Sequence, residues 1–410
     1  MSGFVEEVKS IDDCLDMASS SLGFPWEIQS RFISLDESFL TRAARDIASD
    51  EMLPPFTRSL RDGYAVRHSD TTGASPGSPV FLRLSGNVSM GCAPDFAVSR
   101  EEAASILTGG MMPEGADAVI MLEDTEPSGE WIEVRASVQR GENLVFAGEE
   151  IERGEILVRR GELIDANTQG LLAAFGVSRL ETIDIKIGVL STGDEIVPVS
   201  AATLPDGSVR DVNNHVIRSL LRRYGFTSES FGIAPDGWEE LESRAGEVMS
   251  KCDVALLSGG SSVGARDNTA RILKSMPEPG LILHGINMSP GKPTLIGGAA
   301  ADKKLVVGLP GHPLSCVVAV VFVILPVLLS LIGAKSRRVG RYSLMPLEYD
   351  VQGRTGADEF IPMALAGGTA RPLTAKSGYV SAMKEADGFI RLRPDKETLR
   401  AGEAAEIWLW

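Results

Sequence analysis

The sequence has little cysteine and little histidine. Four of each occur among its 410 residues. The cysteines (14, 92, 252 and 316) form no Cys-x-x-Cys pair, which argues against both a zinc knuckle and a disulfide framework. The histidines show no His-Glu-x-x-His spacing, so the commonest hydrolytic zinc motif is excluded. No basic segment followed by an apolar run opens the chain, and we therefore expect a cytoplasmic protein.

An excess of positive charge is also missing. The chain carries 40 lysines and arginines against 56 aspartates and glutamates, a formal net charge of −16. This balance disfavours nucleic acid and anionic lipid as partners. An anionic small molecule would have to be held locally, by backbone amides and one or two cations, because charges are screened beyond about 10 Å.

Long apolar runs are nearly absent, and the one exception is the uncharged segment from Cys316 to Ile332. It is shorter than the roughly 20 residues that a membrane span needs, and Pro326 and Ser330 interrupt it. We therefore predict a buried helix of a globular domain. A scaffold attached to a membrane through this segment is the alternative.

The length predicts several domains. Residues 1–55 read as helical, including a helix over 38–53, and we expect them to join 141–182 in a discontinuous linking domain. Short segments punctuated by Gly and Pro predict a small β-rich domain at 56–140. Strands and helices alternate over 183–334, and 335–410 contain short alternating segments typical of a β-barrel-like domain. The predicted fold class is thus multidomain α/β plus β.

The alternating region predicts a doubly wound parallel sheet covered on both faces. Strands are expected at 186–190, 226–233, 254–257, 281–286 and 304–307. Helices are expected at 214–223, 238–249, 267–275 and 313–332. Ligands of such sheets bind at the carboxyl ends of the strands, so the loops that follow the strands are the candidate site.

The most informative of these loops follows the apolar strand Val254 to Leu257. Its sequence, Ser-Gly-Gly-Ser-Ser-Val-Gly (258–264), leads into the helix expected near Asp267. Glycines let backbone amides crowd around an anion, and a helix N-terminus adds partial positive charge. The pattern indicates a phosphate or oxyanion site, although a plain strand-to-helix connection has the same composition.

Three further loops should meet at the same edge of the sheet: 191–195, 290–293 and 309–313. Asp194 and Glu195 directly follow a strand, where paired carboxylates could hold Mg²⁺ or orient an attacking oxygen. A solvated turn is the alternative. Asp253 opens its strand some 15 Å from the glycine loop and is predicted to be structural.

Six motifs together resemble a known family: DGYAV (62–66), TGGMMPEGADAVI (108–120), STGDEI (191–196), SGGSSVG with Asp267, PGKP (290–293) and LPGHPLS (309–315). Their order and spacing are similar to those of molybdopterin molybdenumtransferases, the group that includes bacterial molybdenum-insertion proteins and the gephyrin E domain. The resemblance implies an elongated homodimer of four-domain chains with a pterin-binding α/β domain and an active site completed by the partner. It also implies insertion of molybdate into adenylated molybdopterin, with release of AMP and assistance from Mg²⁺.

The resemblance assigns roles to individual residues. It implies catalytic roles for Asp62, Glu195, Asp236 and Asp267, and Asp194 with Glu195 are our candidates for holding the metal. The glycine loop should receive the terminal phosphate of the pterin, with Lys292 nearby as a point charge. The substrate-binding candidates are Thr108, Ser258, Gly259, Gly260, Ser261, Ser262, Gly264, Lys292, Pro310, Gly311, Pro313, Ser315 and Ser377.

Some positions depart from the family pattern, and several of them lose a cation. Two family lysines are replaced by Gly285 and Ser289, and two family arginines by Val145 and Pro362. An aspartate is replaced by Glu150 and an asparagine by His312. Arg61, Arg266, Lys376 and His312 are the candidate substitutes. Two functional hypotheses follow. The first is a molybdate- or tungstate-inserting transferase, with other cofactor-biosynthesis proteins as candidate partners. The second is a pterin-binding or sensing module that has lost the insertion step.

Overall fold

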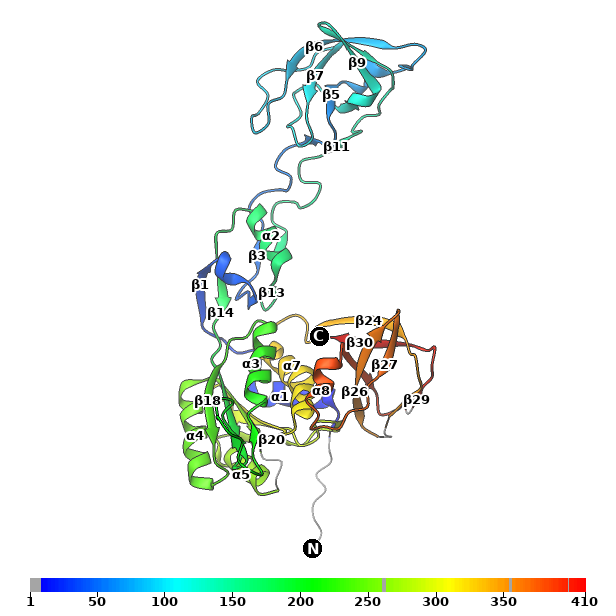
Figure 1. Ribbon diagram of the computed structural model, residues 1–410. Helices are drawn as coiled ribbons and strands as arrows, with labels where there is room; N and C mark the ends of the chain where they lie inside the picture. Colours follow the sequence, from blue (N-terminus) through cyan, green and yellow to red (C-terminus); the bar gives the residue numbers. More distant parts are fainter. Residues whose placement is uncertain (1–8, 260–262, 354–355, 397) are drawn as a thin grey trace. The chain divides into compact units, whose positions relative to one another are not determined.

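The computed structural model describes residues 9–259, 263–353, 356–396 and 398–410 (Figure 1). The chain divides into two compact units. One comprises 47–157 with 174–176, and the other comprises the remaining residues. Each is described by itself, and the boundaries of the four expected domains stay predictions.

The unit around 47–157 is built on a six-stranded sheet, in agreement with the predicted β-rich region. Its strand order is β8-β5-β7-β6-β10-β9. The strands are β5 (Gly63–Val66), β6 (Val80–Asn87), β7 (Glu102–Ile106), β8 (Ala118–Met121), β9 (Thr125–Ser128) and β10 (Trp131–Val134). Leu82, Ile120 and Ile132 are fully buried in its core. Two short strands, β4 (Arg58–Ser59) and β11 (Leu144–Val145), pair beside it.

The helix predicted over 38–53 is wrong. The segment contains β2 (Thr41–Arg42) and β3 (Ile47–Ala48), and Leu40 has a φ of 55°, which a helix does not accommodate. β2 pairs with β13 (Leu163–Ile164). Arg42 is buried and donates to the carbonyl oxygens of Gly161 and Tyr224 at 2.6 and 2.7 Å. Partners far along the chain therefore override the local helix propensity.

The helical reading of residues 1–55 is confirmed at 11–22 and is also wrong at 30–34, where a strand forms. Helix α1 (Ile11–Leu22) begins at Ser10, whose hydroxyl accepts the Asp13 N–H, and ends at Gly23 in the left-handed region. It buries one face in the core that also contains α7. Helix α2 (Ala166–Ala174) is followed by Gly176 with a φ of 68°. β1 (Ser30–Ser34) pairs antiparallel with β14 (Arg179–Ile183), and β12 spans Ile156–Val158.

The α/β region contains a six-stranded sheet of order β18-β15-β19-β23-β22-β20. The strands are β15 (Ile187–Thr192), β18 (Glu229–Ala234), β19 (Val254–Gly259), β20 (Pro279–His284), β22 (Leu295–Ala299) and β23 (Lys304–Leu309). The first four strands in this order are parallel. Because β22 runs antiparallel to both β23 and β20, the sheet is mixed, and the fully parallel sheet expected from the sequence is wrong.

Strand β22 was missed because its sequence, LIGGA, reads as a turn. The two glycines are there for another reason. A Cβ on Gly297 would lie 2.3 Å from the Gly280 carbonyl oxygen, and one on Gly298 would lie 2.0 Å from that of Lys304. Neighbouring backbones approach too closely for a side chain.

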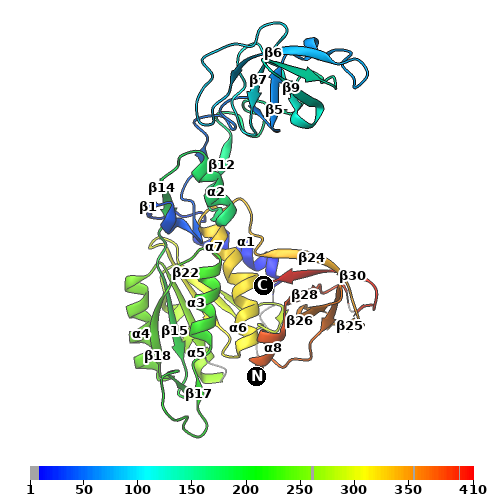
Figure 2. The same ribbon diagram turned by 45° about the horizontal axis from the view of Figure 1, so that its top comes forward.

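Helices cover both faces of this sheet, as predicted (Figure 2). α4 (Trp238–Lys251) and α5 (Val263–Ser275) share one core, which contains Leu241 and Leu273. On the other face, α3 (Asn213–Arg223) packs with a long helix that comprises α6 (Pro313–Ala319), a π-helical segment (Val320–Ile324) and α7 (Leu325–Leu331).

The long apolar helix is a core helix. Within the described residues, Pro313–Leu331 is the one helix that is long and apolar enough to cross a membrane, and 89% of it is buried inside the protein. The predicted burial is confirmed. Phe322 in the π-helical segment stacks on Phe360 at 4.2 Å and ties the helix to the C-terminal sheet.

The C-terminal region is a six-stranded sheet with the order β21-β26-β28-β30-β24, in which β27 pairs with β26. The strands are β21 (Met288–Ser289), β24 (Arg341–Pro346), β26 (Asp358–Ala366), β27 (Thr369–Pro372), β28 (Gly388–Leu392) and β30 (Ala404–Leu409). Strands β25 (Val351–Gln352) and β29 (Thr398–Leu399) pair separately, and α8 spans Ser381–Glu385. Because β21 belongs to the segment between β20 and β22, this sheet is joined to the α/β layer.

Candidate active site at the carboxyl ends of the sheet

Two glycines let neighbouring strands meet closely at this edge. Thr192 at the end of β15 lies opposite Gly259 at the end of β19. Gly259 has a φ of 151°, and a Cβ there would lie 1.9 Å from the Thr192 carbonyl oxygen. Gly193 has a φ of 143°. Only glycine fits this backbone, so the predicted glycine loop begins on a geometrically demanding turn.

Three residues of the glycine loop that are predicted to bind substrate lie outside the described residues. They are Gly260, Ser261 and Ser262. Gly264 and Asp267 fall within helix α5, whose backbone alone is described at these positions, and the same holds for Arg266.

Three carboxylates gather at the ends of β15 and β18. The Asp236 N–H donates to Asp194 Oδ1 at 3.1 Å, and Asn268 Nδ2 donates to the Asp236 carbonyl oxygen at 2.9 Å. Burial, followed by the negative charges of Asp194 and Glu195, raises the pKa of Asp236. Asp236 Oδ1 is buried and has no hydrogen-bond partner in the described part of the chain. The cluster is poised to receive a proton or a cation.

The carboxylates of this cluster could hold Mg²⁺ only together with oxygens of water or substrate. Among the residues described, no group of three His, Cys, Asp or Glu side chains is placed to hold a metal ion. One oxygen of Asp194 is already used to hold the Asp236 loop. Mg²⁺ is commonly bound by one or two carboxylates, water and substrate phosphates, and Glu195 with the second oxygen of Asp194 could supply the carboxylates.

Asn213, which the sequence analysis missed, connects several of the loops. Its Nδ2 donates to Ser258 Oγ at 2.9 Å, to the Gly311 carbonyl oxygen at 2.9 Å and to that of Pro310 at 3.3 Å. Just before it, Asp211 accepts the Ser191 hydroxyl at 2.7 Å. The sequence analysis predicts only that a helix begins near Asn214. The cluster of polar side chains in Asp-Val-Asn-Asn, directly before a buried helix, was a usable signal.

This network places the loops that begin at Ser191, Ser258 and Leu309 at one edge, as predicted, within the described residues. It also shows that some hydroxyls predicted to bind substrate are buried. Ser258 is 2% exposed and Ser315 is 5% exposed. In this conformation the Ser258 hydroxyl accepts the Asn213 hydrogen bond and helps to hold the loops at this edge of the sheet. Pro313 is the first residue of α6, directly after the Pro310–Gly311 carbonyls that Asn213 holds.

Replacing Asn213 by Ala should loosen this edge of the sheet. Three acceptors would lose their donor in a buried setting, so we expect the free energy of unfolding to fall by about 1 to 3 kcal/mol. Urea denaturation would measure the change. Asn167→Ala, at an exposed position in α2, is the matched control. Equal stability of the two variants would contradict the connecting role of Asn213.

The fourth loop brings Lys292 to the same edge, because it links β20 to β22 where the other strands end. Lys292 is exposed, and its carbonyl oxygen accepts the Ile286 N–H at 2.9 Å. Gly285, where the resemblance implies a lysine in the family, has a φ of 98°. A lysine would be strained there, so the local backbone suits the residue present. Ser289, at the second lysine position, pairs with Glu359 in the C-terminal sheet.

Ser377 reaches the edge from the C-terminal region. Its carbonyl oxygen accepts the Leu314 N–H at 3.0 Å, and a Cβ on Gly378 would lie 3.4 Å from the His312 ring. His312 and Lys376 are exposed. Two of the candidate substitute cations thus belong to segments that touch, which sequence separation alone did not reveal.

The C-terminal sheet does not replace the arginine lost at Pro362. Pro362 pairs with Phe389, and Arg391 stands opposite Phe360 on the neighbouring strand. Arg391 is the nearby guanidinium, but it donates to both oxygens of the buried Asp358, at 2.7 and 3.0 Å. This pairing leaves little capacity for a molybdate or phosphate oxygen.

Asp62 and Thr108 meet within the β-rich unit. The Thr108 N–H and hydroxyl both donate to Asp62 Oδ1, at 2.7 and 2.8 Å, and these bonds hold the pKa of Asp62 below its usual range. Glu150 forms an ion pair with Arg58 at 3.4 Å. Val145 lies on β11, paired with Arg58.

The fold and the edge together define a multidomain protein whose α/β layer carries glycine turns and a carboxylate cluster at one edge of its sheet. Three family profiles match successive parts of the chain: the MoeA N-terminal region (domain I and II) at 9–176, a probable molybdopterin binding domain at 188–330, and the MoeA C-terminal region (domain IV) at 345–410. The chain belongs to the MoeA family of molybdenum cofactor biosynthesis proteins, which includes the molybdopterin molybdenumtransferases.

Individual relatives agree over nearly the whole chain. A putative molybdopterin biosynthesis protein of Methanocaldococcus jannaschii is 28% identical over 391 residues, covering 92% of this chain and 91% of the relative. A molybdopterin molybdenumtransferase of Staphylococcus epidermidis is 28% identical over 394 residues, covering 93% and 92%. The structure of a molybdopterin biosynthesis MoeA protein of Pyrococcus horikoshii matches with a TM-score of 0.74 and 33% identity, covering 98% and 99%.

Proposed function

We propose that this protein inserts molybdate into adenylated molybdopterin with release of AMP. The observation that carries the proposal is the raised pKa of Asp236 beside two further carboxylates, at an edge built from glycine turns. A carboxylate with a raised pKa is a stronger base than usual and can accept a proton from an attacking oxygen. The neighbouring backbone amides and Lys292 would hold the phosphates.

Each group has a defined task in the proposed reaction. An oxygen nucleophile attacks the adenylyl phosphorus, the bond to the molybdopterin phosphate breaks, and AMP leaves. Asp236 accepts the nucleophile's proton, while Glu195 and Asp194 keep the carboxylate cluster in place. Mg²⁺ held by Asp194 and Glu195 would offset the charge of the phosphoanhydride. Asp62, Thr108 and Ser377 are further proposed contacts of the substrate.

The test is release of AMP from adenylated molybdopterin by the purified chain. We expect AMP to form when molybdate and Mg²⁺ are both present and its rate to fall when either is withheld, because the metal offsets charge and molybdate is the second substrate. Chromatography of the nucleotide product measures it. Tungstate in place of molybdate separates the two oxyanions. Binding without any turnover would contradict the proposal.

A second candidate function is a molybdopterin-binding or sensing module. It is favoured by the pairing of Arg391 with Asp358 and by the backbone at Gly285, which together leave two lost cations unreplaced in the described residues. Turnover above about 0.1 per second, near the range of ordinary enzymes, would exclude this candidate. A homodimer whose partner completes the cleft also stays a prediction, which sedimentation equilibrium would check, as does the cytoplasmic location.

A further inference from the structure

A second cavity lies away from the carboxyl ends of the sheet. Its volume is about 950 Å³, and its walls come from 40–42, 159–165, the end of α3, the segment 329–341 and the end of the chain at Leu409 and Trp410. We refer to it as the basic cavity because of its seven cationic side chains: Arg42, Arg159, Arg160, Arg223, Lys335, Arg338 and Arg341. The only side-chain carboxylates in its lining are Glu162 and Asp165. A formal excess of five positive side-chain charges thus lines one cavity in a chain of net charge −16.

The two carboxylates are already counted in this excess, and both accept hydrogen bonds from neighbouring backbone or hydroxyl groups. Asp165 Oδ1 accepts the N–H and the hydroxyl of Thr168, both at 2.9 Å, and these bonds lower the pKa of Asp165. Glu162 Oε2 accepts the Arg159 N–H at 2.9 Å. Of the seven cations, only Arg338 forms an ion pair with a carboxylate, that of Glu406, within the described residues.

The basic cavity is lined both by arginines that are held by backbone carbonyl oxygens and by arginines that are exposed. Arg42 is fixed by two backbone carbonyl oxygens, and burial lowers its pKa to about 10. Arg160 donates to the Ile332 carbonyl oxygen at 3.1 Å. The side chains of Arg159, Arg223 and Arg341 are exposed. Exposed guanidinium groups therefore line the cavity together with the buried Arg42.

An unpaired donor in the wall gives an independent indication of a ligand. Trp410 Nε1 is buried and has no hydrogen-bond partner among the described residues. Its neighbour Trp408 donates from Nε1 to the Val339 carbonyl oxygen at 2.8 Å. A buried indole N–H normally finds an acceptor. Trp410 therefore leaves one donor unsatisfied among the residues that line the cavity.

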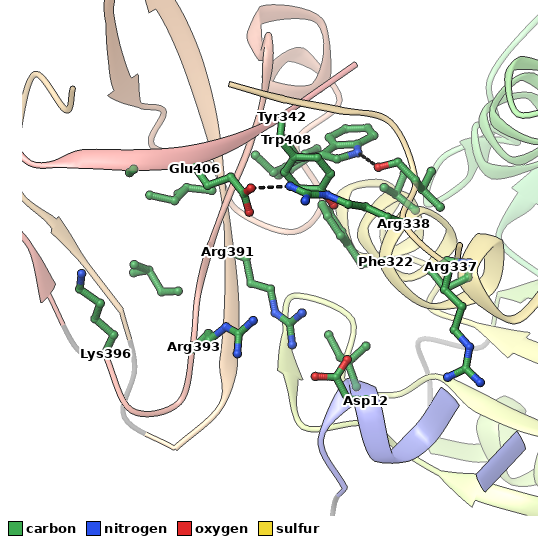
Figure 3. A pocket seen from close by; sticks show the side chains of 18 of the residues that line it. Asp12, Phe322, Arg337, Arg338, Tyr342, Arg391, Arg393, Lys396, Glu406 and Trp408 are labelled. Atoms are coloured by element: carbon green, nitrogen blue, oxygen red, sulfur yellow. Dashed lines mark hydrogen bonds and ion pairs between the residues drawn. The ribbon is translucent and has the colours of Figure 1, made fainter. Parts of the chain in front are cut away.

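The cavity shown in Figure 3 provides a contrast within the same protein. It has a volume of about 800 Å³ and is lined by five cationic and four acidic residues. There Arg338 pairs with Glu406, and Arg337 is bonded to Asp16 at 2.6 Å. The cationic and acidic residues of this cavity are nearly equal in number. The surplus of cations in the basic cavity is therefore not shared by this other cavity.

We propose that the basic cavity is a binding site for a small anion with at least two phosphoryl groups, such as the diphosphate of a nucleoside diphosphate. Guanidinium groups match phosphate oxygens in pairs, and a single phosphate, with at most about two charges, would leave most of the excess unbalanced. The volume is within the usual range for small-molecule sites, about 300–1,000 Å³. This site is separate from the edge at which adenylated molybdopterin is proposed to react.

Isothermal titration of the full chain with inorganic pyrophosphate tests the proposal. We expect saturable binding at low salt and a loss of affinity of about tenfold or more in the double variant Arg223→Ala/Arg341→Ala, which removes two charged donors. Arg222→Ala is the matched control, since Arg222 is exposed, adjacent on α3 and outside the lining. Its affinity should change less than about twofold because screening weakens distant charges.

Three results would overturn the proposal. One is equal binding by the double variant and the wild type, and another is no binding by the wild type at millimolar pyrophosphate. The third is citrate binding as tightly as pyrophosphate, which would show charge attraction without phosphoryl recognition. Lys292→Ala separates the two sites, because pyrophosphate held only at the edge of the sheet would lose affinity in that variant. Titration at two protein concentrations shows whether a second copy of the chain covers the cavity. If it does, the affinity for pyrophosphate would fall as the protein concentration rises. That result would also contradict the proposal.

Discussion

Replacing Asp236 by Asn is expected to slow AMP release about 10²- to 10⁴-fold, the usual effect of removing a general base. The amide keeps the size of the side chain but cannot accept the nucleophile's proton. Binding of adenylated molybdopterin should persist, since one negative charge is removed from beside the phosphates. Single-turnover release of AMP, with affinity measured separately by calorimetry, distinguishes the two effects. Asp302→Asn, on the exposed turn between β22 and β23, is the control.

The pH dependence provides a second measurement on the same variant. Burial and two neighbouring carboxylates raise the pKa of Asp236. The base is active only when ionised, so the acidic limb of kcat/KM should lie above the ordinary aspartate pKa of 3.8. In the variant this limb should be absent. A variant with the wild-type limb would show that another group titrates.

The same substitution should raise the melting temperature at neutral pH. The pKa of Asp236 is higher in the folded chain than in the unfolded one, so the folded state binds the proton more tightly. Its contribution to stability is therefore present below the unfolded pKa and declines as the pH rises through the folded pKa. Above that range the ionised group disfavours folding, and asparagine removes this effect. A gain in stability together with a loss of turnover is typical of active-site residues.

Replacing Gly259 by Ala is expected to lower the free energy of unfolding of the unit that contains the sheet by about 3 to 5 kcal/mol, a large effect for one residue. The added Cβ would lie 1.9 Å from the Thr192 carbonyl oxygen, and the φ of 151° is strained for any side chain. Strand β19 would have to separate from β15 at the edge where the substrate is proposed to bind. We therefore expect loss of pterin binding as well.

Urea denaturation followed by circular dichroism measures this change. Gly246→Ala is the matched control, because its Cβ would meet nothing within 4 Å in helix α4. There alanine should stabilise the helix by up to about 1 kcal/mol. If both alanine variants unfolded at the same urea concentration, close approach of β15 and β19 would not be what requires glycine at 259.

The sequence analysis succeeded where local pattern and burial agree. The strands β15, β19 and β23 are apolar runs bounded by glycine or polar turns, and the helices that cover them show helical periodicity. It failed where distant contacts decide. Residues 38–53 have helix-forming composition, yet Arg42 bonds to carbonyl oxygens far along the chain and the segment forms short strands. The glycines of β22 indicated a turn, although they serve close backbone packing.

For this protein the amino-acid order by itself determined the family, the glycine turns and the residues that follow each strand, because these depend on neighbours along the chain. The tertiary structure alone decided which polar groups meet. It showed that Asn213 joins the loops that follow β19 and β23, that Asp358 occupies Arg391, and that cations from several separate segments line one cavity. Such contacts depend on how strands and helices pack in space, and spacing along the sequence does not encode that packing in a readable form.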